Sequence, residues 1–75
     1  MKWEVEVWYK PGVTDSTGDS VKKGIKDLNV SGVEEVKTGQ VYIISGKIGK
    51  AEVEKICSGL LANNVVQYYN IKQVK

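Results

Sequence analysis

The chain begins with an alternating stretch, Lys2-Trp3-Glu4-Val5-Glu6-Val7-Trp8-Tyr9. Successive side chains of a β-strand point to opposite faces, so a period of two predicts a strand with one apolar and one polar face. Trp8 is the exception, because it is an aromatic residue on the polar face. We interpret Trp8 either as a ring lying over a neighbouring strand or as a contact in an oligomer.

A turn and a helix are expected after this strand. Pro11 lacks a backbone donor and Gly12 adopts positive φ readily, so the two residues end the strand in a turn. Asp15 is placed to cap a helix that spans about residues 16–29. One face of this helix carries residues at helical spacing, namely Gly18, Val21, Ile25 and Leu28.

The middle of the chain, residues 33–48, has β-type sequence that Gly39 interrupts. It predicts either one long strand bent at a bulge or a short hairpin split at this glycine. The run from Val41 to Ile44 is apolar on both faces. We therefore expect one face of this strand to meet helices and the other to meet something else, such as another subunit.

The last third of the chain predicts a second helix and a closing strand. The helix begins at Gly49 or Lys50 and runs to about Ala62, and its apolar stripe consists of Val53, Ile56, Cys57, Leu60 and Leu61. Asn63 is placed to end this helix in the left-handed conformation. A strand is expected over residues 65–74.

The predicted order of elements is β-α-β-(β)-α-β. Two amphipathic helices on one face of a small, mainly antiparallel sheet make an α+β two-layer sandwich that is broadly ferredoxin-like. The other face of the sheet has no helix to cover it, so it suits pairing with another copy of the chain. The candidates for an oligomer contact on that face are Trp8, Tyr42, Ile44 and Tyr68.

The composition excludes several kinds of catalytic site. The sequence has 75 residues with no His, no Arg and a single cysteine, Cys57. Without His there is no Ser-His-Asp or Cys-His pair and no zinc site of the Cys/His type. Cys57 is expected to be a buried structural thiol. Glu4 and Glu6 share one strand face, where we expect solvated carboxylates rather than an acid/base pair.

Size and charge indicate that the chain works with partners. A chain this short buries only about 60% of the surface that its unfolded form exposes. One cysteine forms no internal disulfide, so oligomerisation is the expected source of further stability and a reducing compartment is expected. The net charge is only +2 and the lysines are spread along the chain, so no nucleic-acid partner is expected. No membrane-spanning run or signal peptide is evident, so we expect a cytoplasmic protein with no membrane partner.

Three segments of the sequence together resemble one known family. The first carries Lys10, Pro11, Gly12, Val13, Asp15 and Gly18; the second carries Gly32, Val33, Val36, Lys37 and Gly39. The third contains Leu60, Leu61, Ala62, Asn63, Val65, Val66, Tyr69 and Ile71. In this order and at these spacings they resemble the PurS family, the small subunit of phosphoribosylformylglycinamidine synthase, over a single domain of residues 1–75.

The resemblance implies a non-catalytic subunit of an enzyme complex in the fourth step of de novo purine synthesis. The expected partners are a PurL-type synthetase subunit, a PurQ-type glutaminase subunit and further copies of this chain, as a homodimer or homotetramer. ATP, Mg²⁺ and glutamine would be used by the partner subunits, with no catalytic, cofactor or metal site in this chain. The family is thought to help complex assembly and ammonia transfer.

The motifs also imply which residues lie at a partner contact or an oligomer interface: Lys10, Pro11, Gly12, Asp15, Gly18, Lys37, Gly39 and, for the oligomer, Asn63. The chain departs from the family pattern at Lys37-Thr38-Gly39-Gln40, where Arg-x-Gly-Lys is usual. Lys lacks the bidentate fork of Arg, and Gln40 lacks charge. Leu28-Asn29 replaces the usual Leu-Gly, and Asn still adopts a left-handed helix cap.

A second hypothesis belongs to another functional class. A small α+β chain with an uncovered sheet face also suits an ACT-like regulatory module, which binds a small metabolite between paired sheets. The two hypotheses predict different partners, since the first requires two large enzyme subunits and the second requires a metabolite.

Overall fold

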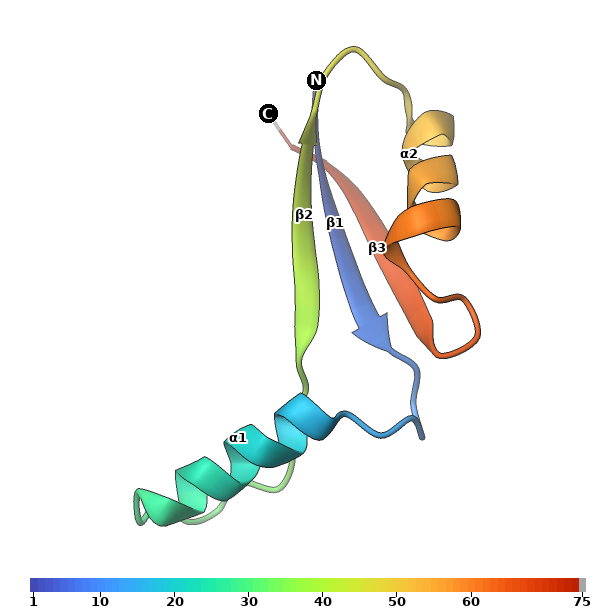
Figure 1. Cartoon of the computed structure of the whole chain (residues 1–75). Coiled ribbons are helices and arrows are strands. Elements are labelled where there is room, and N and C mark those ends of the chain that lie inside the picture. Colours follow the sequence, from blue (N-terminus) through green and yellow to red (C-terminus); the bar gives the residue numbers. More distant parts are fainter. Residues whose placement is uncertain (75) are drawn as a thin grey trace.

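The computed structural model describes residues 1–74, which form one three-stranded antiparallel sheet and two helical segments (Figure 1). The strands lie in the order β2-β1-β3, with bounds β1 Lys2–Tyr9, β2 Gly39–Ser45 and β3 Gln67–Val74. The helices are α1 Ser16–Asp27 and α2 Lys50–Ile56, and α2 continues as the π-helical turn η1 Cys57–Leu61. The predicted α+β class with an antiparallel sheet is confirmed.

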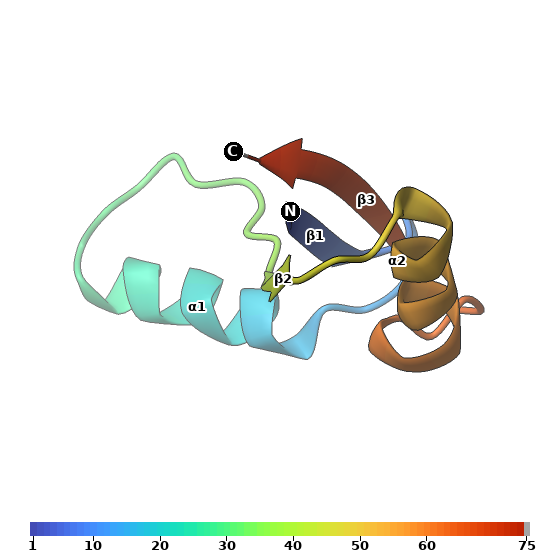
Figure 2. The same ribbon diagram turned by 90° about the horizontal axis from the view of Figure 1, so that it is seen from above.

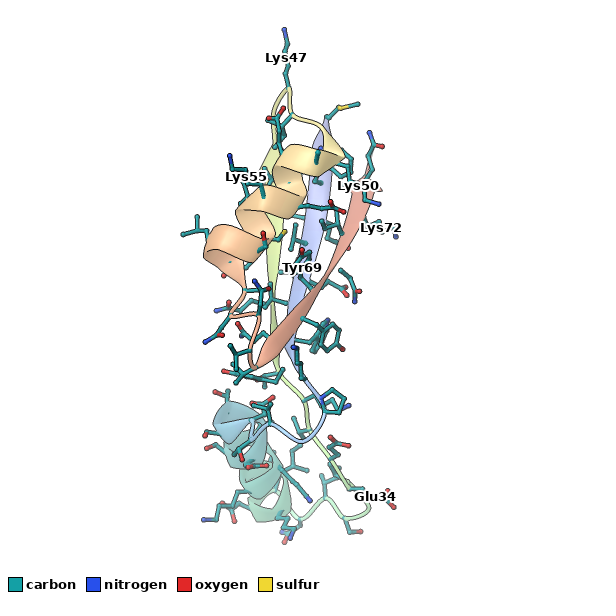
Figure 3. The ribbon with its side chains drawn as sticks, turned by 90° about the vertical axis from the view of Figure 1, so that its right-hand side faces the viewer. Glu34, Lys47, Lys50, Lys55, Tyr69 and Lys72 are labelled. Carbon is teal, nitrogen blue, oxygen red and sulfur yellow. The ribbon has the colours of Figure 1, made fainter. Side chains whose placement is uncertain are left out.

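The core lies between α2 and one face of the sheet. The alternation in β1 buries Trp3, Val5 and Val7 on that face, and Val53 and Cys57 reach down from α2 and η1. The indole Nε1 of Trp3 donates a hydrogen bond to the Ile48 carbonyl at 3.2 Å, which ties the loop before α2 to the sheet. Figure 3 shows α2 crossing the face of the sheet with Tyr69 of β3 beside it. The partly buried residues at the margin of the core are Tyr42, Ile44, Ile48, Leu61, Tyr69 and Ile71.

The first helix does not lie on the sheet of its own chain. Figure 1 shows α1 beyond the end of the sheet, and Figure 2 shows it pointing away from α2. The radius of gyration is 15.5 Å, whereas a compact domain of this length has roughly 11 Å. The expected packing of both helices on one face of the sheet is therefore not made within a single chain, and α2 alone covers the sheet.

The segment before β2 also differs from the prediction. Residues 30–38 form no strand, so both alternatives for residues 33–48, one long strand bent at Gly39 and a hairpin split there, are wrong, and Gly39 is the first residue of β2. Gly39 lies opposite Trp8 in the β1–β2 pairing, and a Cβ at this position would fall 2.7 Å from the Trp8 ring and 2.8 Å from the Val7 carbonyl oxygen. Glycine lets the Trp8 ring lie over β2 at this point, as the first of our two interpretations expected.

The sequence predicted a capping residue at three helix ends, and two of these three predictions are correct. Asp15 is the N-cap of α1, and Asn29 follows the end of α1 with a φ of +63°, so both expectations are confirmed. The expected left-handed end at Asn63 is wrong, because Ala62 leaves the helix in extended conformation. The side-chain oxygen of Asn63 instead accepts from the Val65 N–H at 3.1 Å, which forms a turn, and β3 begins two residues later than expected, at Gln67.

Candidate partner-binding site

The three segments that carry the family resemblance meet at one end of the sheet, where β1 ends and β2 begins. We call this region the motif junction, and it comprises residues 10–18, 35–39 and 63–67 (Figure 1). All eight residues that the motifs single out lie in it: Lys10, Pro11, Gly12, Asp15, Gly18, Lys37, Gly39 and Asn63. Their contact with a partner protein stays a prediction, but their common location is a property of the fold.

Lys10 joins the first and third segments. Its backbone N–H donates to the Val66 carbonyl at 2.9 Å, and its Nζ donates to the Asn64 carbonyl at 2.7 Å. Its own carbonyl accepts from the Val13 N–H at 3.1 Å, which closes the turn through Pro11 and Gly12. Gly12 has a φ of +86°, a conformation that residues with a Cβ rarely adopt. Lys10 therefore holds the turn after β1 against the loop before β3.

Asp15 joins the first and second segments. One carboxylate oxygen accepts from the Gly18 N–H at 2.8 Å, and the other accepts from the Thr38 N–H at 2.6 Å. The Thr38 hydroxyl lies 2.8 and 2.9 Å from the two oxygens. The backbone N–H groups of Gly18 and Thr38 stabilise the charged carboxylate and lower the pKa of Asp15 below its usual 3.8. Sequence reasoning found Asp15 as a cap but missed Thr38, which no motif marked.

A hollow of about 320 Å³ lies between the turn of residues 10–15 and residues 35–38. Trp8 and Tyr68, which lie opposite each other on the sheet face that α2 does not cover, line part of it. Its charged lining is mixed, with Lys10 and Lys37 set against Asp15, Asp19 and Glu35. Lys37 and Glu35 form an exposed ion pair at 3.9 Å, an interaction that is worth little in water.

The uncovered sheet face carries different residues of β2 from those expected. Tyr42 pairs with Val5 and Ile44 pairs with Trp3, so both lie on the face that α2 covers, and their predicted place on the oligomer face is wrong. The free face instead presents Val41 and Ile43, which are 59% and 55% exposed. Trp8 and Tyr68 lie on the free face as predicted, opposite each other on β1 and β3. We call Trp8, Val41, Ile43 and Tyr68 the free-face patch.

A second uncovered apolar surface lies on α1 and the residues that follow it. Of the expected stripe, only Gly18 is buried, while Val21 and Leu28 are 45% and 75% exposed. Val30, just beyond the helix, is 50% exposed. The Lys22 Nζ donates to the Glu34 carbonyl at 2.6 Å, which holds the returning segment alongside the helix. We call α1 together with residues 28–37 the arm, and Figure 3 shows Glu34 of the arm at the opposite end of the molecule from Lys47.

The remaining reactive side chains that the sequence analysis considered are Cys57, Glu4 and Glu6. Cys57 is fully buried, and burial raises the pKa of its thiol, with a smaller contribution from the charge of Glu54. Glu4 and Glu6 lie half-buried on the free face of β1. Within residues 1–74, no three His, Cys, Asp or Glu side chains gather in a way that could hold a metal ion. Neither helix in this part of the chain has the length and apolar character needed to cross a membrane.

Comparison with known proteins decides the family. The sequence model of PurS, described as phosphoribosylformylglycinamidine (FGAM) synthase, matches residues 2–75. The chain belongs to the PurS family. The PurS subunit of phosphoribosylformylglycinamidine synthase from Archaeoglobus fulgidus is 33% identical over 73 residues, which cover 91% of each chain. The PurS subunit from Methanocaldococcus jannaschii is 34% identical over 79 residues, which cover 99% of this chain and 95% of its relative.

Solved PurS structures share the fold. The crystal structure of M. jannaschii PurS, described as one of the subunits of formylglycinamide ribonucleotide amidotransferase in the purine biosynthetic pathway, superposes with a TM-score of 0.85. It is 31% identical and covers 99% of this chain and 98% of its own. B. subtilis PurS gives a TM-score of 0.86 at 25% identity, covering 95% and 94%. A PurLQS structure from Thermotoga maritima has a TM-score of 0.80 at 23% identity, covers 97% and 95%, and shows the fold alone.

Proposed function

We propose that this chain is the PurS subunit of a phosphoribosylformylglycinamidine synthase and that it joins a PurL-type synthetase to a PurQ-type glutaminase. The observation that carries this proposal is the family match over residues 2–75, together with the meeting of all three motif segments at one junction. The M. jannaschii relative is described as one of several subunits of the amidotransferase, which fits a chain that acts through its surfaces. Of the two hypotheses drawn from the sequence, these observations favour the PurS subunit over the regulatory module.

In this role the chain positions the active sites of its partner subunits and carries out no chemical step itself. The glutaminase would release ammonia from glutamine, and the synthetase would use it with ATP and Mg²⁺. Holding the two active sites in a fixed arrangement raises the effective concentration of ammonia at the synthetase and limits its loss to water. We place this work in the cytoplasm, where a lone buried thiol such as Cys57 stays reduced.

The chain also acts as a homo-oligomer in this proposal, as a dimer or a dimer of dimers. Its two uncovered apolar surfaces, the arm and the free-face patch, support this role. Burying apolar area contributes about 25 cal/mol per Å², so a second copy that covered Leu28, Val41 and Ile43 would add stability that one chain lacks. The single chain is elongated, with extents of 48 × 28 × 14 Å, which is consistent with an arm that contacts another copy.

Reconstitution tests the proposal. The purified chain is mixed with the PurL-type and PurQ-type subunits of its own organism, and glutamine-dependent amidation of formylglycinamide ribonucleotide is measured with and without this chain. We expect glutamine-dependent activity to collapse when the chain is omitted. Amidation driven by added ammonium should persist, because the synthetase then needs no glutaminase. Undiminished glutamine-dependent activity without the chain would overturn the proposal.

A further inference from the structure

We propose that Asp15 and Thr38 form a latch that fixes the direction in which the arm leaves the sheet, and that this direction is required for the arm to dock on a second copy of the chain. The inference rests on the proposed function in one respect, since it takes the homo-oligomer as the assembly that forms. It assigns Asp15 a positioning role beyond capping its own helix.

The latch joins the two connections between the arm and the sheet. The arm joins the sheet through residues 10–15 on one side and through residues 37–39 on the other. Asp15 bridges both, because one oxygen binds the Gly18 N–H at the start of α1 and the other binds the Thr38 N–H just before β2. A single carboxylate thus ties the first turn of the arm to the edge strand of the sheet.

Close packing at Gly18 makes this bridge possible. A Cβ at Gly18 would collide with the Val36 carbonyl oxygen, so only glycine lets residues 36–38 approach the first turn of α1 this closely. Thr38 is then near enough to place both its N–H and its hydroxyl on the Asp15 carboxylate. Gly18 and Asp15 act together, the first by allowing the approach and the second by binding what approaches.

Little else sets the direction of the arm. Within residues 1–74, α1 has no extensive packing against any strand, and Figure 1 shows it beyond the end of the sheet. The helix has 12 residues, so at 1.5 Å per residue it is a lever of about 18 Å. A rotation of about 20° at the latch would therefore move the far end, near Leu28, by roughly 6 Å.

A second copy is the occupant that the arm fits, because the same chain carries an uncovered apolar face of its own. The arm presents Val21, Leu28 and Val30, and the sheet presents Val41 and Ile43, all of them 45% exposed or more. An arm that is already aimed loses less conformational entropy on docking than one that must first be ordered, so the latch favours association. We infer that loosening the latch weakens self-association while the sheet and its core stay folded.

The test uses Asp15→Asn with Asp19→Asn as the matched control. Asn keeps an oxygen for the Gly18 N–H and is as good an N-cap as Asp, but it places an amide N–H₂ where the Thr38 N–H needs an acceptor. Asp19→Asn makes the same charge change on the exposed side of the same turn. Self-association is measured by sedimentation equilibrium, and folding is followed by far-UV circular dichroism and tryptophan fluorescence.

We expect Asp15→Asn to raise the dissociation constant of the homo-oligomer at least tenfold with folded spectra, and Asp19→Asn to change it by less than about twofold. If Asp15→Asn does not fold, Thr38→Val and Thr38→Ser test the latch instead. Val removes the hydroxyl that binds Asp15, whereas Ser keeps a hydroxyl at this position. Thr38→Val should weaken association, and Thr38→Ser should recover most of the loss.

Two outcomes would overturn the latch. One is an Asp15→Asn or Thr38→Val variant that associates as the unaltered chain does, and the other is an unaltered chain that stays monomeric at every concentration. A variant that associates normally and still supports glutamine-dependent amidation in the reconstituted mixture would disprove the latch. The proposed function would then be unaffected. A different result would overturn the proposed function, namely glutamine-dependent amidation that is undiminished when the chain is omitted.

Discussion

The sheet with α2 and the arm are stabilised in different ways. In the first region Val5, Val7, Val53 and Cys57 are at most 1% exposed, so burial of apolar surface holds it together. Within the arm, Gly18 is the only buried residue, and Leu28 at its far end is 75% exposed. Hydrogen bonds at Asp15 fix the arm at its base. The chain therefore combines a region with a buried core of its own and an arm whose apolar stripe is not covered within the chain.

Truncating one buried valine of the sheet region and one exposed valine of the arm tests whether burial within the chain stabilises only the first region. Val53→Ala opens a cavity in the core and should lower the free energy of unfolding by about 2 kcal/mol at every protein concentration. Val21→Ala removes methyl groups that are 45% exposed in the single chain, so at concentrations where the chain is monomeric it should change stability by less than about 0.5 kcal/mol. Urea unfolding at several protein concentrations measures both. An equal loss in the two variants at low concentration would remove the distinction between the regions.

One glycine in the sheet and one in the arm should respond in opposite directions to replacement by alanine. Gly39→Ala should destabilise the sheet by about 1–3 kcal/mol, because its Cβ would meet the Trp8 ring at 2.7 Å and the Val7 carbonyl oxygen at 2.8 Å. Gly24→Ala, on the arm, meets nothing within 4 Å and replaces a poor helix former, so it should stabilise α1 by up to about 1 kcal/mol. Tryptophan fluorescence during urea unfolding reports the first change and helical circular dichroism the second. A neutral Gly39→Ala would show that the Trp8 ring does not need a glycine beneath it on β2.

The smallest expected effect is a pH dependence at the base of the arm. The pKa of Asp15 is lowered in the folded chain, so its contribution to stability is complete above its ordinary value of 3.8 and is lost as the pH falls through the lower folded value. Urea midpoints measured between pH 2 and 6 should therefore fall less steeply with acidification in Asp15→Asn than in the unaltered chain. Asp19→Asn should keep the original slope, and identical slopes in all three proteins would contradict the role of Asp15.

The sequence predicted those elements whose pattern is local. The alternation from Lys2 to Tyr9 placed β1 to the residue, and Asp15 fixed the start of α1, because each signal depends on near neighbours alone. The period of two could not assign a face to the run from Val41 to Ile44, since all four residues are apolar. Only the register with β1 shows that Tyr42 and Ile44 face α2.

Placement of the arm could not be predicted for a related reason. The stripe of Val21, Ile25 and Leu28 shows that a surface needs cover, but a helical stripe does not say whether the cover comes from the same chain. Thr38 was missed because a threonine beside a glycine gives no local signal of a carboxylate partner 23 positions away. Asn63 was misassigned because its side chain satisfies the turn after η1 with φ still negative.

Amide hydrogen exchange at two protein concentrations compares the protection of the sheet region with that of the arm in one sample. Above the concentration at which the homo-oligomer forms, we expect slow exchange in both α1 and β1. On dilution to the monomer, exchange in α1 should accelerate by at least tenfold while β1, the central strand of the sheet, stays protected. Protection of α1 that is equal at both concentrations would show that the arm does not depend on a second copy for its stability.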